Sequence, residues 1–393
     1  MDTEVLIIGG GTAGITTASR LVRKKYFNKI SLIEPSDKHY YQPLWTLVGG
    51  GEVDKSDTER SEQSLIPEGV TWIKEKAADI LGRKSLVITE SGINIKYKYL
   101  IICPGLTLRW EKIKGLKESI GKNGVCSNYS FDYCDKTWEF IQNTTSGNMI
   151  FTHPSGPLKC AGAPQKIMWL AQDHMKRRGL LSQTQFHFYK SGDGIFGVQK
   201  YKEVLQEMVE QRNIHTHYFK DLIEIKAEQK IAVFKDNKTS EIEEIPYSFL
   251  HVTPYMSPPD FLHGNSLCNE LGEVIVDKHT LQSPKYPNIF SLGDSSSLPT
   301  GKTGAGIRKQ APILVNNLIN YDQGEPLTDK YNGYTSCPIV SGYGRLILAE
   351  FDYDGNPVES FPFNQAKERY SMYLMKKYLL PILYWKGMLK GLA

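Results

Sequence analysis

The sequence predicts an α/β protein with two parallel-sheet domains, the second inserted in the first, and a C-terminal segment that contacts a membrane. Three observations lead to this prediction. The chain opens with a strand, a glycine-rich turn, a helix and another strand. Strands and helices alternate again in its middle part, and after residue 330 the composition shifts to Tyr, Gly and Pro. Such alternation is typical of parallel sheets covered by helices.

The composition is that of an ordinary globular protein and excludes several classes. At 393 residues, with 40% hydrophobic and 23% charged residues, the chain is long enough for two or three domains. A net charge of +4 without a basic block gives no reason to expect nucleic-acid binding. Six cysteines without CxxC or Cys/His spacing indicate neither a secreted disulfide framework nor a zinc site. We expect no nucleic acid and no metal.

The expected elements divide the chain into three parts. Residues 1–115 and 245–330 form the first domain, with the buried strands EVLII, ISLIEP, YLIIC and IFSLG. Residues 116–244 form the second domain, in which strands NMIFTH, QFHFYKS and IHTHYFKD alternate with helices PQKIMWLAQDHMKR and VQKYKEVLQEMVEQR. Residues 331–393 form the C-terminal segment.

The first turn, GGGTAG, is typical of a Rossmann-like dinucleotide-binding domain. Gly9, Gly11 and Gly14 give the GxGxxG spacing directly after a strand. The first permits a tight turn, the second lets backbone N–H groups approach a pyrophosphate, and the third lets the helix pack closely on the sheet. Thr12 opens the helix whose N-terminus favours phosphate charge. Glu34, at the end of the next strand, is placed to accept hydrogen bonds from ribose hydroxyls.

A second pattern favours FAD as that dinucleotide. The strand in IFSLGDSS ends in Gly-Asp and resembles the second FAD motif of flavoprotein reductases, in which the aspartate binds the ribityl chain. This motif assigns Asp294 to the ribityl chain; a simple turn aspartate is the alternative. The following GKTGAGI predicts a helix start whose backbone N–H groups face the flavin, at Gly304, Ala305, Gly306 and Ile307.

The second domain lacks the glycine-rich loop that a nicotinamide dinucleotide would need. After the strand near residue 150 the chain reads HPSGPLKCAGAP, with Pro154, Pro157 and Pro164 in place of a GxGxxG pattern. Each proline removes a backbone donor, and a pyrophosphate cradle is made of such donors. The electron donor is therefore expected to be small, and Cys160 is the residue placed to meet it.

Four stretches give a specific resemblance. KCAGAPQKIMWL, HVTPYMSPPD, YQPLWTLVGGG and GYTSCPIVSGYGRLILAEFDY resemble the mitochondrial type of sulfide:quinone oxidoreductase over essentially the whole chain. The resemblance implies a redox pair of Cys160 and Cys337, with hydrogen sulfide as electron donor and ubiquinone as acceptor. By the family's pattern Cys337 holds a persulfide, Cys160 faces the flavin, and a small acceptor, glutathione or sulfite, removes the extra sulfur. Residues 36–60, where disulfide reductases carry their cysteines, contain none.

The resemblance also implies weaker contacts. Gln42 and the backbone of Ala78 match FAD contacts of the family, although a surface turn or a strand end explains them equally well. Lys376 matches a family lysine whose charge would stabilise reduced flavin, with a solvated helix lysine as the alternative. The other cysteines are expected to be buried structural residues: Cys103, Cys126, Cys134 and Cys268.

The end of the chain predicts a peripheral membrane contact. Residues 369–393 mix Tyr, Trp, Leu and Met with lysines, and the apolar run YLLPILYW is too short to span a bilayer. A pair of short amphipathic helices in the lipid interface fits this pattern; packing on the protein's own core, or on a second subunit in a homodimer, is the alternative. With the resemblance, we expect the inner mitochondrial membrane, or else a bacterial plasma membrane. We expect no targeting peptide in this chain, because the first strand begins almost at the first residue.

Two other functions remain open from the sequence. A type II NADH:quinone oxidoreductase shares the fold but needs the missing second loop. A flavoprotein without catalytic activity, acting as a redox sensor or scaffold, would bind FAD but would not turn over with quinone. The paired cysteine motifs favour the sulfide enzyme over both.

Overall fold

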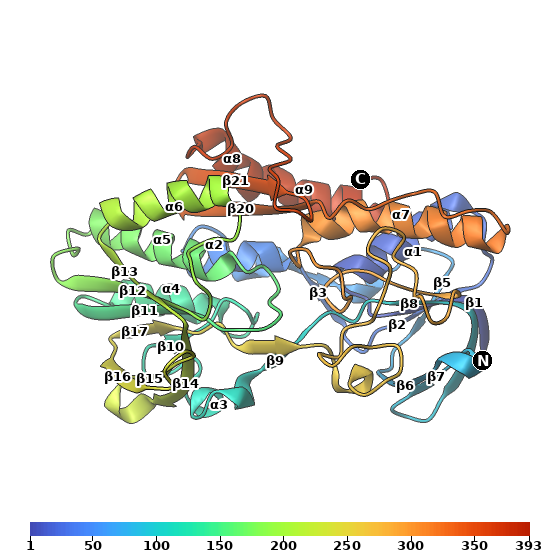
Figure 1. The fold of residues 1–393 in the computed structure, drawn as a ribbon, viewed down its shortest axis with the longest axis horizontal. Helices are drawn as coiled ribbons and strands as arrows, with labels where there is room; N and C mark the ends of the chain where they lie inside the picture. Colours follow the sequence, from blue (N-terminus) through green and yellow to red (C-terminus); the bar gives the residue numbers. More distant parts are fainter.

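The computed structural model describes residues 1–393 and contains two α/β domains with a C-terminal segment lying across both (Figure 1). Each domain is built on its own sheet of mainly parallel strands. The predicted α/β class with two Rossmann-like domains is therefore confirmed.

The first domain has a seven-stranded sheet that begins at the N-terminus. β1 (Asp2–Ile8) pairs in parallel with β2 (Ile30–Ile33) and with β8 (Asn94–Ile102). The C-terminal half of β8 also pairs with β19 (Ile289–Ser291), which joins the two pieces of this domain. The other elements are α1 (Thr12–Lys24), β3 (Lys38–Tyr40), α2 (Trp45–Gly49), β4 (Glu59–Ser61), β5 (Val70–Ile73), β6 (Ala77–Leu81), β7 (Leu86–Thr89) and α7 (Gly304–Asp322).

The second domain has a five-stranded, all-parallel sheet in the order β10-β17-β11-β12-β13. Its strands are β10 (Val125–Cys126), β11 (Gly147–His153), β12 (Thr184–Lys190), β13 (Ile214–Tyr218) and β17 (Phe249–His251). Its helices are α3 (Leu116–Ser119), α4 (Cys134–Asn143), α5 (Ala163–Arg177) and α6 (Gln199–Gln211). The predicted hairpin gains a third strand, forming an antiparallel sheet of β14 (Lys220–Lys226), β15 (Ile231–Asp236) and β16 (Ile242–Pro246).

The chain returns to the first domain later than the sequence predicts. The expected boundary at residue 245 is wrong, because β17 pairs with β11 inside the second sheet. The crossing instead lies at two short strands that pair with each other, β9 (Thr107–Arg109) and β18 (Tyr255–Ser257). The boundary was missed because FLH is too short an apolar run to assign to either sheet from its sequence.

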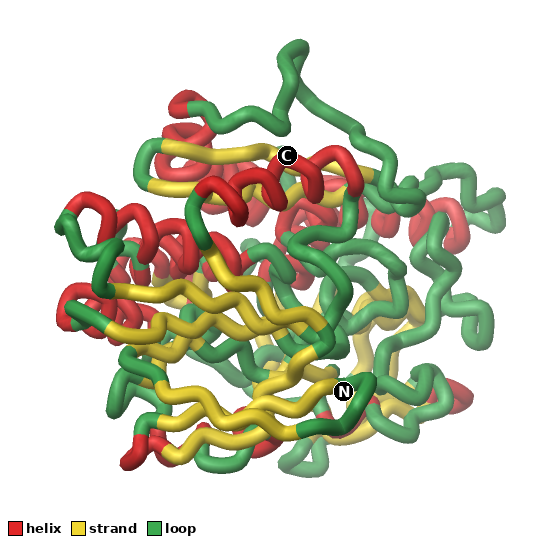
Figure 2. The backbone as a smooth tube through the Cα atoms, turned by 60° about the vertical axis from the view of Figure 1, so that its left-hand side comes forward, coloured by secondary structure: helices red, strands yellow, loops and turns green.

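The C-terminal segment begins with a hairpin of β20 (Thr335–Gly342) and β21 (Arg345–Phe351). The hairpin belongs to neither large sheet, and Figure 2 shows it at the top of the molecule. Its first strand packs on α5 of the second domain and on α7 of the first. The hairpin therefore ties the two domains together, at the level of the loop that precedes α5.

The tail is one continuous helical run and not the expected pair of short helices. α8 (Tyr370–Leu374) passes through a π-helical segment, Met375–Leu379, into α9 (Leu380–Ile382) and then into a second π-helical segment, Leu383–Gly387. Pro381 removes one backbone donor, and the wider π-turns on both sides of it keep the path helical. No helix in the structure combines the length and the apolar character that crossing a bilayer requires.

Candidate active site

The first glycine-rich turn has the geometry of a phosphate loop. Gly9 adopts φ +103°, and a Cβ there would collide with the carbonyl group of Cys103. A Cβ on Gly14 would overlap the Gly9 carbonyl oxygen, so this glycine lets α1 approach the turn. A Cβ on Gly11 would meet nothing within 4 Å, so the loop faces open space at that residue.

The N-terminus of α1 is free to bind an anion. Its first N–H groups, on Thr12, Ala13 and Gly14, have no backbone acceptor, and no side chain caps them. No acidic residue lies in the first turn of this helix. The positive end of the dipole of this 13-residue helix therefore faces the space beside Gly11.

Glu34 lies at the same loop, as its sequence position predicts. Its carboxylate accepts hydrogen bonds from the Gly10 N–H at 2.7 Å and from the Ser36 N–H at 2.8 Å. Burial raises the pKa of Glu34, while the two N–H groups oppose that rise. A carboxylate has about four acceptor sites, so two remain for ribose hydroxyls.

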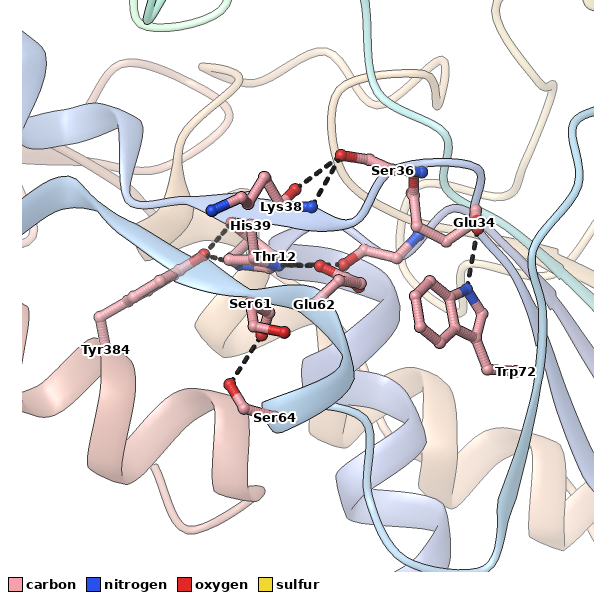
Figure 3. Close-up of polar contacts among 11 residues, drawn as sticks. Thr12, Glu34, Ser36, Lys38, His39, Ser61, Glu62, Ser64, Trp72 and Tyr384 are labelled. Atoms are coloured by element: carbon pink, nitrogen blue, oxygen red, sulfur yellow. Dashed lines mark hydrogen bonds and ion pairs between the residues drawn. The ribbon is translucent and has the colours of Figure 1, made fainter. Parts of the chain in front are cut away.

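A polar cluster behind the loop joins it to the tail, as Figure 3 shows. The Tyr384 hydroxyl lies 2.8 Å from Thr12 Oγ1 and 2.6 Å from His39 Nε2. His39 Nδ1 lies 3.0 Å from Glu62 Oε2. Tyr384, His39 and Glu62 are all buried. The other carboxylate oxygen, Glu62 Oε1, has no partner, which is unusual for a buried carboxylate.

The second predicted flavin motif lies where the two domains meet. The Asp294 side chain makes no hydrogen bond to the protein, and burial raises its pKa while the charges of Lys302 and Lys159 lower it. At the start of α7, Thr303 Oγ1 accepts the Gly306 N–H at 3.1 Å and the Thr303 carbonyl accepts the Ile307 N–H.

The N–H groups of Gly304 and Ala305 remain without acceptors. Together with the open loop at Gly11, the Asp294 carboxylate and the unpartnered Glu62 Oε1, they give the donors and acceptors that a flavin dinucleotide requires. The residues present therefore fit FAD.

Cys160 lies in the loop that replaces the second phosphate loop, between β11 and α5. The backbone of Cys160 is left-handed, with φ 52°, a conformation that costs a non-glycine residue of order 1–3 kcal/mol. Its N–H donates to the Lys302 carbonyl at 2.9 Å, and its own carbonyl accepts from the Ala163 N–H and the Tyr129 hydroxyl. The strained loop is thus fastened to the first domain, beside the predicted flavin motif.

The structure brings Cys337 to the same place from β20, 177 residues further along the chain. Gly162 packs so closely on it that a Cβ would collide with Cys337 Sγ. Both cysteines are free thiols in this structure. The Lys166 ammonium, buried with an exposed fraction of 2%, donates a hydrogen bond to Cys160 Sγ at 3.2 Å.

The charges around the pair favour one ionisation pattern. The hydrogen bond from the Cys337 thiol lowers the pKa of Cys160 well below its ordinary value; burial opposes this, and the charges of Lys166 and Lys376 add to it. The pKa of Cys337 is raised because its thiol is the donor and because it is buried. Burial lowers the pKa of Lys166, but the two sulfurs raise it by more. In the reduced pair these directions favour ionisation of Cys160 before Cys337, beside a charged Lys166.

Lys376 is buried in the same cluster, on the first π-helical segment of the tail. Its ammonium donates to the Pro43 carbonyl at 3.1 Å. Burial lowers the pKa of Lys376 to about 7, and the charge of Lys166 contributes to that lowering. The alternative of a solvated helix lysine is thus wrong, since this side chain is 3% exposed.

Two predicted cofactor contacts lie at the margin of the site. Gln42 is exposed, although its neighbour Pro43 receives the Lys376 hydrogen bond. Ala78 is also exposed and lies in a β-bulge between Ala77 and Asp79, which leaves its backbone outside the strand ladder. Both stay predictions.

Sequence reasoning missed Lys166, the charged group that contacts Cys160 most closely. Residues 163–173 of α5 are all buried, so a lysine among them has to have a partner. That partner lies six residues earlier, outside the helix. A lysine in the first turn of a helix that is otherwise mostly apolar up to Ala171, directly after a cysteine motif, is the signal that was available.

Two cavities flank the cluster. One, of about 740 Å³, is lined by Pro157 and Ala161 of the cysteine loop, by Lys190 and Lys302, and by Tyr353 beyond β21. The other, of about 1010 Å³, lies between the tail and the segment from residue 44 to 60.

Comparisons with known proteins find a matching family model and near-full-length relatives. Residues 3–137 match the family described as pyridine nucleotide-disulphide oxidoreductase. The mitochondrial sulfide:quinone oxidoreductase of Dictyostelium discoideum is 48% identical over 396 residues, which cover 99% of this chain and 86% of that protein. The mitochondrial sulfide:quinone oxidoreductase of Mus musculus is 46% identical over 389 residues, with coverage of 99% and 86%. The solved structure of sulfide:quinone oxidoreductase from the bacterium Aquifex aeolicus has a TM-score of 0.83 at 22% identity, covering 100% of this chain and 92% of that chain, and supports the fold.

Proposed function

This chain belongs to the sulfide:quinone oxidoreductase family, and from that premise we propose that it oxidises hydrogen sulfide through a Cys160–Cys337 disulfide and reduces ubiquinone, with FAD as cofactor. The observation that carries this proposal is the pair of sulfurs brought together from the second domain and the C-terminal hairpin, with the Lys166 ammonium bonded to Cys160. No second glycine-rich loop is present for NADH, which argues against the NADH:quinone alternative.

The sulfide step is thiol–disulfide exchange. A hydrosulfide ion attacks Cys337 Sγ, the bond between the two sulfurs breaks, Cys337 keeps the added sulfur as a persulfide, and Cys160 leaves as a thiolate. The thiol of lower pKa leaves faster. The direction of the pKa shifts therefore supports Cys160 as the leaving group and Cys337 as the sulfur attacked. The Lys166 ammonium stabilises the thiolate as it forms.

The persulfide is then passed to a small anionic acceptor, glutathione or sulfite. The acceptor attacks the outer sulfur, and Cys337 is released as a thiolate. Re-forming the disulfide from the two thiolates releases two electrons, and FAD held between Gly11 and the start of α7 would supply the two-electron acceptor that connects the cysteine pair to the quinone. The cavity of about 740 Å³ beside the cysteine loop supports this step, since a cavity of this size holds a small ligand and Lys190 and Lys302 line it.

The tail supplies the proposed contact with quinone and membrane. Tyr378, Leu379 and Ile382 are each more than half exposed, on one stretch of the helical run. The cavity of about 1010 Å³ beneath them is lined in part by Trp385 and Lys386, an aromatic and basic pairing typical of a lipid interface. The relatives from Dictyostelium discoideum and Mus musculus are named as mitochondrial proteins. We therefore propose that this chain is located at the inner mitochondrial membrane, with a bacterial plasma membrane as the alternative.

The test is steady-state reduction of a short-chain ubiquinone by the purified protein. We expect turnover with sulfide, faster when sulfite or glutathione is present, and formation of thiosulfate or glutathione persulfide in proportion to quinol. Turnover with NADH and none with sulfide would contradict the proposal. A protein that binds FAD but turns over with neither donor would support the sensor or scaffold alternative.

A further inference from the structure

The N-terminal end of α5 and the strand β20 touch where the two cysteines meet. Gly162 caps α5 and packs directly on Cys337 Sγ. α5 and β20 remain in contact beyond this point. The separation of the two sulfurs therefore depends on how this helix and this strand are aligned along each other.

A second contact between them lies at the other end of the strand. Asp173, on α5, has a side chain that is only 8% exposed. One of its oxygens accepts the Tyr343 N–H at 3.0 Å, and the other accepts from Arg345 Nη2 at 2.8 Å. Tyr343 lies in the turn between β20 and β21 and Arg345 follows it, so Asp173 attaches this turn to α5. Arg177 also approaches Asp173, at 3.4 Å, but its own side chain is 58% exposed.

The two contacts span similar lengths. From Gly162 to Asp173 the helix rises by roughly 16 Å at 1.5 Å per residue. From Cys337 to Tyr343 the strand advances by roughly 20 Å at 3.3 Å per residue. The helix and the strand are thus fastened at both ends of one shared stretch. A shift of the strand by one residue would turn Cys337 to the opposite face of the hairpin.

The same ion network reaches the tail and α6. Glu368 Oε1 lies 3.7 Å from Arg345 Nε and 2.8 Å from Arg212 Nη2. Arg212, at the end of α6, also donates to the Ser341 carbonyl on β20 at 2.6 Å. Glu368 lies just before α8, whose helical run carries Lys376. One network of partly exposed charges therefore joins α5, which follows the Cys160 loop, to β20, which carries Cys337, and to the segment that leads into the tail.

We propose that Asp173 is a positioning residue for the redox pair: it holds the β20–β21 turn against α5 and thereby keeps the Cys160 and Cys337 sulfurs within bonding distance. The proposal rests on the proposed function, because it assigns Asp173 to the sulfide half of that reaction. Asp173 touches neither sulfur, and its effect passes through the register of β20 on α5.

The first test compares half-reactions in the Asp173→Asn variant and in a matched control, Asp322→Asn. Asp322 is also a largely buried carboxylate, bound by Tyr26 and Tyr99 in the first domain, but it has no contact with the hairpin. We expect Asp173→Asn to slow flavin reduction by sulfide at least about 10-fold, since misplacing reacting groups by about 1 Å costs up to 10²-fold. Reoxidation of the dithionite-reduced flavin by short-chain ubiquinone should stay within about two-fold of wild type, and Asp322→Asn should leave both steps near wild type.

The second test does not depend on sulfide or flavin. It measures how fast the reduced cysteine pair closes to a disulfide with an added thiol oxidant, and we expect Asp173→Asn to slow this closure at least about 10-fold. If Asp173→Asn does not fold, Arg345→Gln, at a residue 36% exposed, is expected to slow closure in the same direction by less.

Closure at the wild-type rate in the folded Asp173 or Arg345 variant would overturn the proposal. An equal loss in the Asp322 control, or an equal loss in both half-reactions, would also overturn it. A wild-type protein whose flavin is not reduced by sulfide would instead overturn the proposed function, and the closure rates would still decide the role of Asp173.

Discussion

Replacing Lys166 with methionine removes the charge nearest to Cys160 while keeping most of the side-chain volume. At 3.2 Å and an effective dielectric constant of about 20, the attraction between ammonium and thiolate is about 5 kcal/mol. Part of this is offset, because the buried cation also has to give up its hydration. An opposite charge at this range shifts a pKa by about 1–3 units, or about 1.4–4 kcal/mol. We therefore expect Lys166→Met to raise the pKa of Cys160 by about that amount.

The assay follows thiolate formation in the reduced protein. Alkylation by iodoacetamide is measured against pH in a Cys337→Ser background, so that only one thiol of the pair reacts. Lys376→Met is the matched control, because Lys376 is also buried but its ammonium bonds to the Pro43 carbonyl and not to sulfur. We expect it to shift the profile less than Lys166→Met does. A profile that Lys166→Met leaves unmoved, or a larger shift from Lys376→Met, would refute the electrostatic account of the pair.

Three further predictions concern the tail and its contacts. Lys376 loses its charge as pH rises through about 7. We therefore measure the rate of flavin reduction by sulfide in the wild-type protein and in Lys376→Met, and expect the wild-type rate divided by the variant rate to fall across that pH range. A ratio that does not change with pH would contradict this. Tyr384→Phe removes the hydrogen bond to Thr12 at the phosphate loop. It should weaken FAD binding by about 1 kcal/mol, which is roughly a five-fold increase in Kd measured by equilibrium dialysis. An unchanged Kd would mean that this contact of the tail does not support cofactor binding. Leu379→Asp should reduce sedimentation with anionic vesicles while Ile242→Asp, an equally exposed change on β16, should not; equal binding by both would mean that the tail is not the membrane contact.

Local patterns in the sequence predicted the elements of both domains well. GGGTAG follows β1 and opens α1, and Glu34 lies at the loop as its spacing requires. These features are local, since the turn, the helix dipole and the acid after the next strand all lie within one βαβ unit. The absence of a second phosphate loop around Cys160 was also predicted, because this stretch has prolines in place of glycines. That inference does not depend on where the strand before the loop ends or where the helix after it begins.

Long-range contacts could not be predicted in the same way. That Cys337 meets Cys160 depends on a hairpin packed across two domains, and only the resemblance to a family indicated it. In the sequence, Lys166 and Asp173 look like ordinary polar residues of a helix. Only the packing of β20 beside α5 shows that both are buried, and a buried charged side chain needs a partner. The boundary at β17 was missed for a related reason, since three residues carry too little periodicity to show which sheet they join.

The central claim is that sulfide delivers its electrons through Cys160 and Cys337. The most direct test mixes the purified protein with sodium sulfide in the absence of oxygen and follows the visible absorption of the flavin. We expect sulfide to bleach the flavin in the wild-type protein, short-chain ubiquinone to restore it, and both Cys160→Ser and Cys337→Ser to abolish the bleaching. Bleaching by NADH while sulfide is inert, or bleaching by sulfide that persists in either variant, would contradict the account.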